Sequence, residues 1–302
     1  MTLTVGPWQL EPVHGGDFSI DGGAGFGVVP KSVWQTVWPC DANNLVRFTC
    51  RCLLARNGDT NVLIDTGYGG KHPAIDRKAY QMENGNPLLE SLAAKGIAPN
   101  DVDCILFTHL HFDHAGGATV FDTKGRLVPA FPKAKYMAQV WEWEDAISRR
   151  PELVAAYPAD NLFPLQEHGC IDTFRSGEQL FPGLMAIRTG GHTRGHTAFL
   201  FQSASTPEGA HEGVLFIGDL CPTAAHTRML WNMSYDTFLL ETRRIKRYWL
   251  EQAANNRWWL LFPHDPRMAY CQIERHPKKE FVVTAMTRNE FPTNQQKHTP
   301  FP

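Results

Sequence analysis

Metal-binding residue types crowd into one short segment, and this crowding constrains the fold more than any other feature of the sequence. Three histidines and one aspartate fall within six residues, directly after an apolar stretch (102–108) that we expect to be a strand. The run reads His109-Leu110-His111-Phe112-Asp113-His114. Neutral imidazole nitrogens are good donors to borderline cations at neutral pH. Side chains two apart in extended backbone point the same way, so His109 and His111 can bind one ion, and a turn can direct Asp113 and His114 to a second.

Three later segments also place a histidine or an aspartate at the end of an apolar, strand-like stretch. His192 follows the stretch 184–189, Asp219 closes the stretch 214–219, and His264 follows the stretch 258–262. Ligand sites in open α/β sheets lie outside the carboxyl ends of the strands. Four strand ends with such donors therefore predict one shared metal site. We interpret His196 as a neighbour of this site that does not bind an ion itself.

The remaining sequence alternates between strand and helix patterns, which predicts a mixed α/β fold. Asn57-Gly58-Asp59 predicts a hairpin turn between strands at 52–55 and 61–65. Helices are expected over 88–95, 140–147 and 235–255, the last with Ser234 as N-cap and Asp236 in its first turn. No linker divides the chain, so we expect a single domain over 1–302. Residues 1–50, with a glycine-rich loop at 21–27, are expected to form an arm over the pocket or at a dimer contact.

Composition argues against several classes of protein. The 29 basic and 31 acidic residues give a formal net charge of −2, whereas nucleic-acid-binding domains usually carry a basic surplus. No apolar run reaches the roughly 18 residues that a membrane helix needs. The absence of a secretory signal pattern and the odd number of cysteines, 7, favour a reduced, cytoplasmic setting. Cys50 and Cys52 alternate along one expected strand, so we interpret them as packing residues rather than as a zinc-binding pair.

The seven candidate donors resemble the ligand pattern of the metallo-β-lactamase superfamily. The run 109–114 matches its His-x-His-x-Asp-His motif, and the later donors follow in the family's order. The resemblance implies an αββα sandwich, in which two mixed sheets are flanked by helices. It implies that one ion is bound by His109, His111 and His192, a second by Asp113, His114 and His264, and both by a bridging Asp219. Asp65 resembles the family's aspartate that orders the metal-binding loop.

A closer resemblance is to YtnP-like quorum-quenching N-acyl homoserine lactonases, carried by segments 21–31, 108–115, 189–196, 222–226 and 231–236. Other lactonases of the superfamily have a catalytic tyrosine shortly after the bridging aspartate, where this chain reads Leu220-Cys221-Pro222-Thr223. A metal ion or another donor such as His226 would then polarise the substrate carbonyl, although His226 is equally well interpreted as a loop histidine. The candidate catalytic residues are Asp113, Asp219 and His226.

The function that these residues imply is hydrolysis at a dinuclear metal centre. Two nearby divalent cations lower the pKa of a bridging water, which gives hydroxide at neutral pH. Zinc is the first candidate, and the ligands also suit manganese, cobalt or iron. The resemblance favours opening of a lactone ring in an N-acyl homoserine lactone, and the alternatives are thioesters of the hydroxyacylglutathione type, phosphotriesters and other carboxylesters. A non-catalytic metal-binding protein is the alternative from another class, and the aromatic N-terminal arm is compatible with a homodimer.

Overall fold

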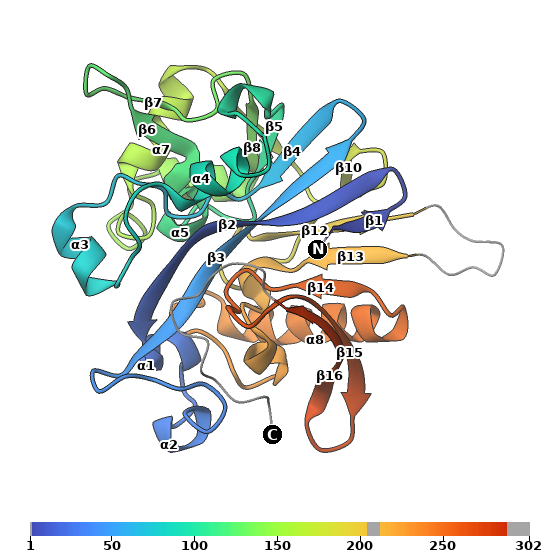
Figure 1. Cartoon of the computed structure of the whole chain (residues 1–302). Helices are drawn as coiled ribbons and strands as arrows, with labels where there is room; N and C mark the ends of the chain where they lie inside the picture. The colour runs from blue at the N-terminus through green and yellow to red at the C-terminus, as the bar shows by residue number, and fades with distance from the viewer. Residues whose placement is uncertain (1, 204–211, 289–302) are drawn as a thin grey trace.

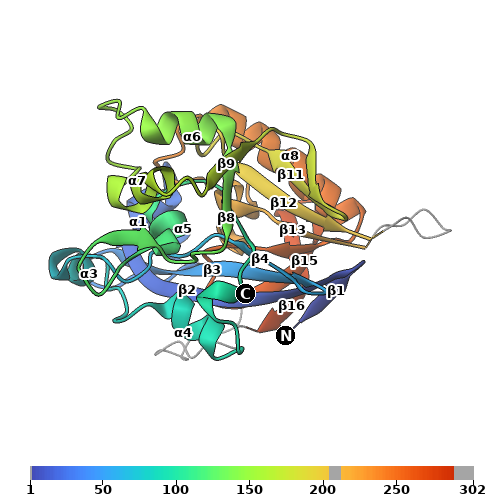
Figure 2. The ribbon, with the colours of Figure 1, turned by 90° about the horizontal axis from the view of Figure 1, so that it is seen from above.

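The computed structural model describes residues 2–203 and 212–288, which form two facing seven-stranded β-sheets with helices on their outer sides (Figures 1 and 2). This arrangement confirms the predicted αββα sandwich. In spatial order, the first sheet contains β1 (Leu3–Val5), β2 (Trp8–Asp21), β3 (Leu45–Asn57), β4 (Thr60–Ile64), β5 (Cys104–Leu106), β8 (Lys135–Gln139) and β9 (Ile171–Phe174). The second contains β10 (Glu178–Phe181), β11 (Leu184–Arg188), β12 (Thr197–Gln202), β13 (Gly213–Phe216), β14 (Trp259–Leu261), β15 (Met268–His276) and β16 (Glu280–Arg288). The strands β6 (Thr119–Phe121) and β7 (Leu127–Pro129) form a separate ribbon.

The helices of the described residues are short, except for the last. They are α1 (Gly22–Phe26), α2 (Lys31–Trp34), α3 (Ala74–Ala79), α4 (Pro87–Ala93), α5 (Phe112–Ala115), α6 (Val140–Ile147), α7 (Ala159–Glu167) and α8 (Leu239–Asn255). Single 3-10 turns lie at Pro99–Asp101, Gly116–Ala118, Gly218–Leu220 and Ala224–Thr227. Within ranges 2–203 and 212–288, no helix is both long and apolar enough to cross a membrane.

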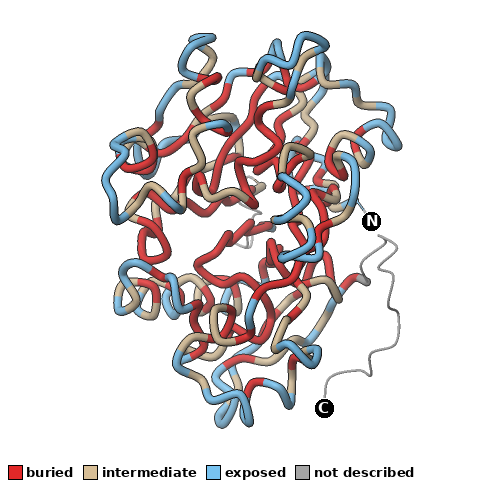
Figure 3. Tube along the Cα trace, turned by 90° about the vertical axis from the view of Figure 1, so that its left-hand side faces the viewer, coloured by how far each residue is buried: buried red, intermediate tan, exposed pale blue. Residues whose placement is uncertain are grey.

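Both sheets mix parallel and antiparallel pairs, as predicted. β4, β5, β8 and β9 pair in parallel in the first sheet, and β13 pairs in parallel with β14 in the second. Apolar side chains of the two inner faces pack together, for example Leu53 and Leu106 with Phe199 and Phe216. Helices α4, α6 and α7 cover the first sheet, whereas Leu250 and Ala253 of α8 pack on the second. Burial of these apolar surfaces, which run through the centre of the trace in Figure 3, stabilises the layered fold.

The N-terminal segment, expected as an arm over the pocket or at a dimer contact, contributes β1, β2 and the first part of β3 to the first sheet. β2 is 14 residues long and pairs with β3 from Gln9 to Asp21. The loop expected at 21–27 contains α1, because the Asp21 carboxylate accepts hydrogen bonds from the amides of Gly23 (2.7 Å) and Ala24 (3.3 Å) at its first turn. The Trp34 ring stacks on Phe26 of the same chain at 5.1 Å. A dimer contact through this segment stays a prediction.

The helix α8 begins at Leu239 rather than at the predicted Tyr235. The amide of Phe238 donates to Gly191 O at 2.7 Å, and that of Thr237 donates to His192 O at 3.0 Å. Because the Phe238 amide is bonded to Gly191, it cannot donate to the carbonyl four residues before it, and the helical bonds begin where the Thr242 amide donates to Phe238 O at 3.0 Å. The segment before α8 consequently lies against the loop that carries His192.

Candidate metal centre

Asp65, directly after β4, holds the first metal-binding segment in place. Its Oδ1 accepts a hydrogen bond from the Thr108 amide at 2.8 Å, and its Oδ2 accepts one from the Thr108 hydroxyl at 2.8 Å. Oδ2 also accepts from His114 Nδ1 at 2.9 Å. One buried carboxylate therefore ties together both ends of the segment 108–114. The backbone of Asp65 is left-handed, with φ 58°, a strained conformation for a residue other than glycine that these bonds maintain.

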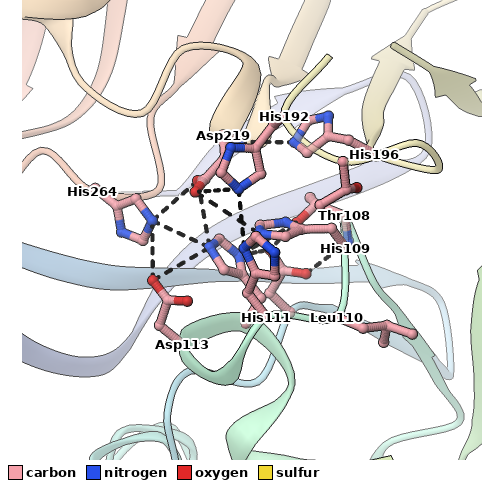
Figure 4. Close-up of polar contacts among 12 residues, drawn as sticks. Thr108, His109, Leu110, His111, Asp113, His192, His196, Asp219 and His264 are labelled. Carbon is pink, nitrogen blue, oxygen red and sulfur yellow. Dashed lines mark hydrogen bonds and ion pairs between the residues drawn. The ribbon is translucent and has the colours of Figure 1, made fainter. Parts of the chain in front are cut away.

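A first group of donors consists of His109, His111 and His192. Their ligand atoms all lie within 4.8 Å of one another. His192 Nε2 is 3.1 Å from His111 Nδ1, and Figure 4 shows the three rings facing a common point. Because the rings come from the loop after β5 and the loop after β11, the two sheets each contribute to this group.

A second group consists of Asp113, His114 and His264. His114 Nε2 lies 3.2 Å from His264 Nε2, and Asp113 Oδ2 lies 3.4 Å from the same His264 nitrogen. Asp113 and His114 are in the short helix α5, and His264 follows β14. Each of these residues is buried, Asp113 being the most accessible at 9%.

Asp219 lies between the two groups. Its Oδ2 is 3.4 Å from His192 Nε2 in the first group. Its Oδ1 is 3.0 Å from His264 Nε2 and 3.4 Å from His114 Nε2 in the second. One carboxylate thus presents one oxygen to each group of imidazoles, which is the arrangement required of a bridging ligand.

Buried polar atoms without partners show that this donor set suits cations. In the part of the chain that the structure describes, His109 Nε2 and Asp219 Oδ1 are buried and make no hydrogen bond. An unsatisfied buried polar atom costs roughly 1–3 kcal/mol. The imidazole nitrogens and carboxylate oxygens here match the ligands that zinc and similar divalent ions prefer. Divalent ions would therefore satisfy atoms that the protein itself leaves unpaired.

Charges within the site also favour a cation. Burial lowers the pKa of His109 well below its ordinary value, and the nearby imidazoles lower it further. Burial acts in the same direction on His114, but Asp219, Asp113 and Asp65 outweigh it and raise the pKa of His114 well above its ordinary value. The carboxylates thus require positive charge beside them, which a proton on His114 or a metal ion can supply.

Most of the candidate ligand histidines are oriented by a hydrogen bond from their second ring nitrogen. His192 Nδ1 donates to Asp236 Oδ1 at 2.8 Å, and His264 Nδ1 donates to Thr49 O at 2.8 Å. His114 is held by Asp65, as described above. Such bonds fix the tautomer, so that in the neutral ring the other nitrogen presents its lone pair to the centre.

Sequence reasoning missed Asp236, because an aspartate near the start of a helical pattern is also expected in a first helical turn. We predict that Asp236→Ala lowers the affinity for metal ions about 10–100-fold, since His192 loses its orienting partner. Titration of the metal-free protein with zinc, followed by calorimetry, measures this change. Asp236→Asn, which keeps an acceptor oxygen, is expected to lose less affinity. Equal affinities in wild type and Asp236→Ala would contradict the prediction.

Two further buried side chains support the metal-binding loops from outside. The Asp219 amide donates to His196 Nε2 at 2.9 Å, which agrees with the interpretation of His196 as a neighbour rather than a ligand. Glu142 of α6 accepts hydrogen bonds from the Leu110 amide at 3.0 Å and from the Thr193 hydroxyl. It therefore joins the loops that carry the first group of donors. No local motif marks Glu142, because its partners lie far from it in sequence.

His226 lies outside both groups of donors. Its Nε2 donates to Gly25 O at 2.8 Å, and its Nδ1 accepts from the Thr223 hydroxyl at 2.7 Å. Its ring stacks on Phe26 at 5.0 Å and is fully buried, and burial lowers its pKa to about 3. With both nitrogens bonded within the protein, this histidine connects the turn after Asp219 to α1.

Tyr235 places a phenol beside the donors, as does Tyr157, whose ring centroid lies 5.5 Å from that of His111. The ring centroid of Tyr235 lies 5.7 Å from that of His192, and 42% of the residue is exposed. Desolvation and then the charges of Asp219 and Asp113 raise the pKa of the Tyr235 phenol well above its ordinary value. The sequence assigned Tyr235 to a helix, and only the bonds of the following residues to the His192 loop reveal its position.

The sandwich fold and its histidine and aspartate donors define the class of metal-dependent hydrolases with an αββα architecture. Residues 45–248 match the family model of the Metallo-beta-lactamase superfamily, and the chain belongs to this superfamily.

Relatives and solved structures agree with this assignment. The N-acyl homoserine lactonase AiiA of Bacillus thuringiensis subsp. kurstaki is 24% identical over 164 residues, which cover 50% of this chain and 58% of the relative. The match thus spans little more than half the length of that relative. A probable metal-dependent hydrolase from Staphylococcus aureus superposes with a TM-score of 0.86 at 26% identity, covering 96% of this chain and 100% of the other. AidC, a dizinc quorum-quenching lactonase solved with a product, superposes with a TM-score of 0.70 at 19% identity, covering 97% and 98%.

Proposed function

We propose that this chain is a dinuclear hydrolase that opens the ring of N-acyl homoserine lactones. The observation that carries the proposal is the position of Asp219, which presents one oxygen to each of two groups of donors. The names of AiiA and AidC, both lactonases, support this substrate class. We assign the first ion to His109, His111 and His192, the second to Asp113, His114 and His264, and Asp219 to both. Zinc is the first candidate, ahead of manganese, cobalt and iron.

The bound ions would supply Lewis acidity and a nucleophile at neutral pH. The protein's own residues orient the ligand histidines and provide carboxylates that can accept a proton. Asp65 and Asp236 keep the His114 and His192 rings turned inwards through their Nδ1 bonds. We assign to Asp113 and Asp219 the task of accepting a proton during the reaction, since they are the carboxylates inside the site. His226 is assigned a positioning role, because both its nitrogens are occupied.

Half-buried aromatic rings beside the donors suit an acyl chain. Phe112 lies between two assigned ligands in sequence, and its ring is 5.6 Å from that of Tyr80 and 6.1 Å from that of Phe18. Tyr80 is 38% exposed, so the cluster reaches the surface. Contact with apolar carbon atoms is favourable on such surfaces. We therefore place the acyl chain of the substrate along these rings.

The Tyr235 hydroxyl is proposed to donate a hydrogen bond to the substrate oxygen on which charge develops. We predict that Tyr235→Phe lowers kcat about 10²-fold, because one donor to that oxygen is lost while the ring is kept. Steady-state kinetics and metal analysis on the same samples provide the measurement. Metal content is expected to stay unchanged, and Tyr248→Phe, a control on the exposed face of α8 where the residue is 51% exposed, is expected to keep near wild-type kcat. An unchanged kcat in Tyr235→Phe would remove the hydroxyl from the mechanism.

The proposed function is tested by proton release from N-hexanoyl homoserine lactone, with metal-loaded and chelator-treated protein. Rapid release that the chelator abolishes, and that His109→Ala lacks while His276→Ala retains it, would support a lactonase. A protein shown to hold two ions that releases no proton from lactones would refute this substrate class. The same samples would then be assayed with a glutathione thioester, a phosphotriester and simple carboxylesters. Failure on every ester would favour a non-catalytic metal-binding protein.

A further inference from the structure

Cys50, which we interpreted from the sequence as a packing residue, lies beside the second group of donors. It is in the middle of β3, is 2% exposed, and belongs to the aromatic cluster that includes Phe18 and Phe48. Its Sγ and the ligand atoms of Asp113 and His264 all lie within 4.8 Å of one another. Three segments distant in sequence, a central strand, α5 and the loop after β14, thus bring a thiol, a carboxylate and an imidazole together.

The surroundings of this trio require a positive charge. Asp219 Oδ1 lies 3.0 Å from His264 Nε2 and, among the described residues, is a buried atom without a hydrogen bond. Asp113 Oδ2 lies 3.4 Å from the same nitrogen, and Figure 4 shows both carboxylates turned towards His264. Without a cation, burial and then the charge of Asp113 raise the pKa of the Cys50 thiol well above its ordinary value. A divalent ion reverses this effect, because its own charge becomes the largest in the site.

We propose that Cys50 Sγ is a ligand of the second divalent ion, together with Asp113 and His264. Binding breaks the S–H bond, the proton leaves to solvent, and the thiolate sulfur donates to the ion. The inference rests on the proposed function only in that it uses the assigned second ion. It adds a selectivity to that site, because a thiolate favours zinc or cobalt over manganese, whereas carboxylate and imidazole alone discriminate less.

Cys52 provides an internal control on the same strand. It is also buried, but it packs in the cluster of Val13, Leu54 and Leu63 on the side of α4. The two cysteines lie on the same strand and are both buried. Only Cys50 lies next to assigned ligands. A comparison of Cys50→Ser with Cys52→Ser therefore separates metal binding from the loss of a buried sulfur.

The test uses the full chain loaded with two cobalt(II) ions, with metal content measured on each sample. Wild type and Cys52→Ser are expected to show a near-ultraviolet thiolate-to-cobalt charge-transfer band, which Cys50→Ser lacks. Zinc titration of Cys50→Ser is expected to show at least a tenfold (~1.4 kcal/mol) weaker affinity for one of the two ions only. A fully loaded wild type without the band, or a band that persists in Cys50→Ser, would overturn the proposal.

If Cys50→Ser fails to fold, X-ray absorption by zinc in the wild type decides the question. A zinc–sulfur distance of ~2.3 Å supports ligation by Cys50 and its absence refutes it. Lactone turnover is recorded on the same samples. Turnover without the band refutes Cys50 as a ligand and leaves the proposed function standing, whereas a band without turnover supports Cys50 and refutes the lactone substrate.

Discussion

Asp219→Asn is expected to lower kcat/KM by about 10³-fold or more, because both groups of donors lose the carboxylate that lies between them. Asp219 presents Oδ2 to His192 and Oδ1 to His264 at 3.4 and 3.0 Å. Asparagine keeps the shape of the side chain but removes its negative charge and replaces one oxygen with an amide nitrogen, which is not a ligand. Both ions would then lose a shared ligand. The histidines of the two groups would also lose the negative charge between them that offsets the positive charge of the ions.

Metal analysis after dialysis and steady-state kinetics measure the two parts of this expectation separately. We expect fewer than two ions per chain in Asp219→Asn, and excess zinc in the assay should restore only part of the activity. Asp145→Asn is the matched control, because Asp145 is also a buried aspartate but pairs with Arg150 and Arg194 away from the donors. A variant that keeps two tightly bound ions and wild-type kcat/KM would exclude Asp219 as a bridge.

All seven candidate donors could be found from the sequence because each lies next to a local pattern. The run 109–114 places four donors in six residues, and His192, Asp219 and His264 each follow an apolar stretch. Apolar patterning decides which segments become central strands, and strand ends in such sheets form the site. The hairpin turn at Asn57-Gly58-Asp59 and the helix 140–147 were likewise predicted, because turn chemistry and periodicity are properties of the segment itself.

Features that depend on distant partners could not be predicted in this way. Tyr235 and Asp236 continue the helical pattern of 235–255, yet the amides of Thr237 and Phe238 bond to the 191–192 loop and the helix begins only at Leu239. Local propensity carries no information about that loop. Cys50 was interpreted from its alternation with Cys52, which correctly indicates a strand. Which of the two sulfurs adjoins Asp113 and His264 depends on how α5 and the loop after β14 pack on that strand.

In the N-terminal region, too, a contact with a distant residue decides a local structure that the sequence pattern does not predict. A glycine-rich segment such as 22–27 has a low intrinsic helix propensity, so a loop was the natural expectation. Helix α1 forms because Asp21 caps it and because His226, 201 residues away, donates to Gly25 O. A long-range hydrogen bond thus overrides a local preference, and it places α1 against the turn that follows Asp219.

Removal of the metal ions is expected to lower the melting temperature of this protein by about 10 °C or more. A ligand that binds only the folded state at about 1,000 times its Kd stabilises that state by ~4 kcal/mol. In a chain of 302 residues, 1 kcal/mol corresponds to roughly 1.5 °C, so two such ions would together contribute about 12 °C. Without ions, the pKa of the buried His109 imidazole stays lowered by burial, and the carboxylates of the site have no dication beside them. Apo protein therefore retains the cost of a buried polar centre that metal binding compensates.

Scanning calorimetry of zinc-loaded and chelator-treated protein measures the shift, and Asp219→Asn tests its origin. If the stabilisation comes from ions at this centre, the variant should melt near the apo wild type and respond little to zinc. Cys52→Ser, which alters the core but not the donors, should retain the full zinc-dependent shift even if its melting temperatures are lower overall. Equal melting temperatures for loaded and chelated wild type, with two ions bound in the former, would mean that the donors are preorganised without strain. His109 Nε2 and Asp219 Oδ1 argue against that outcome, because both are buried atoms without a hydrogen bond in the described part of the chain. Buried polar atoms usually have a hydrogen-bond partner when no ion is to be bound.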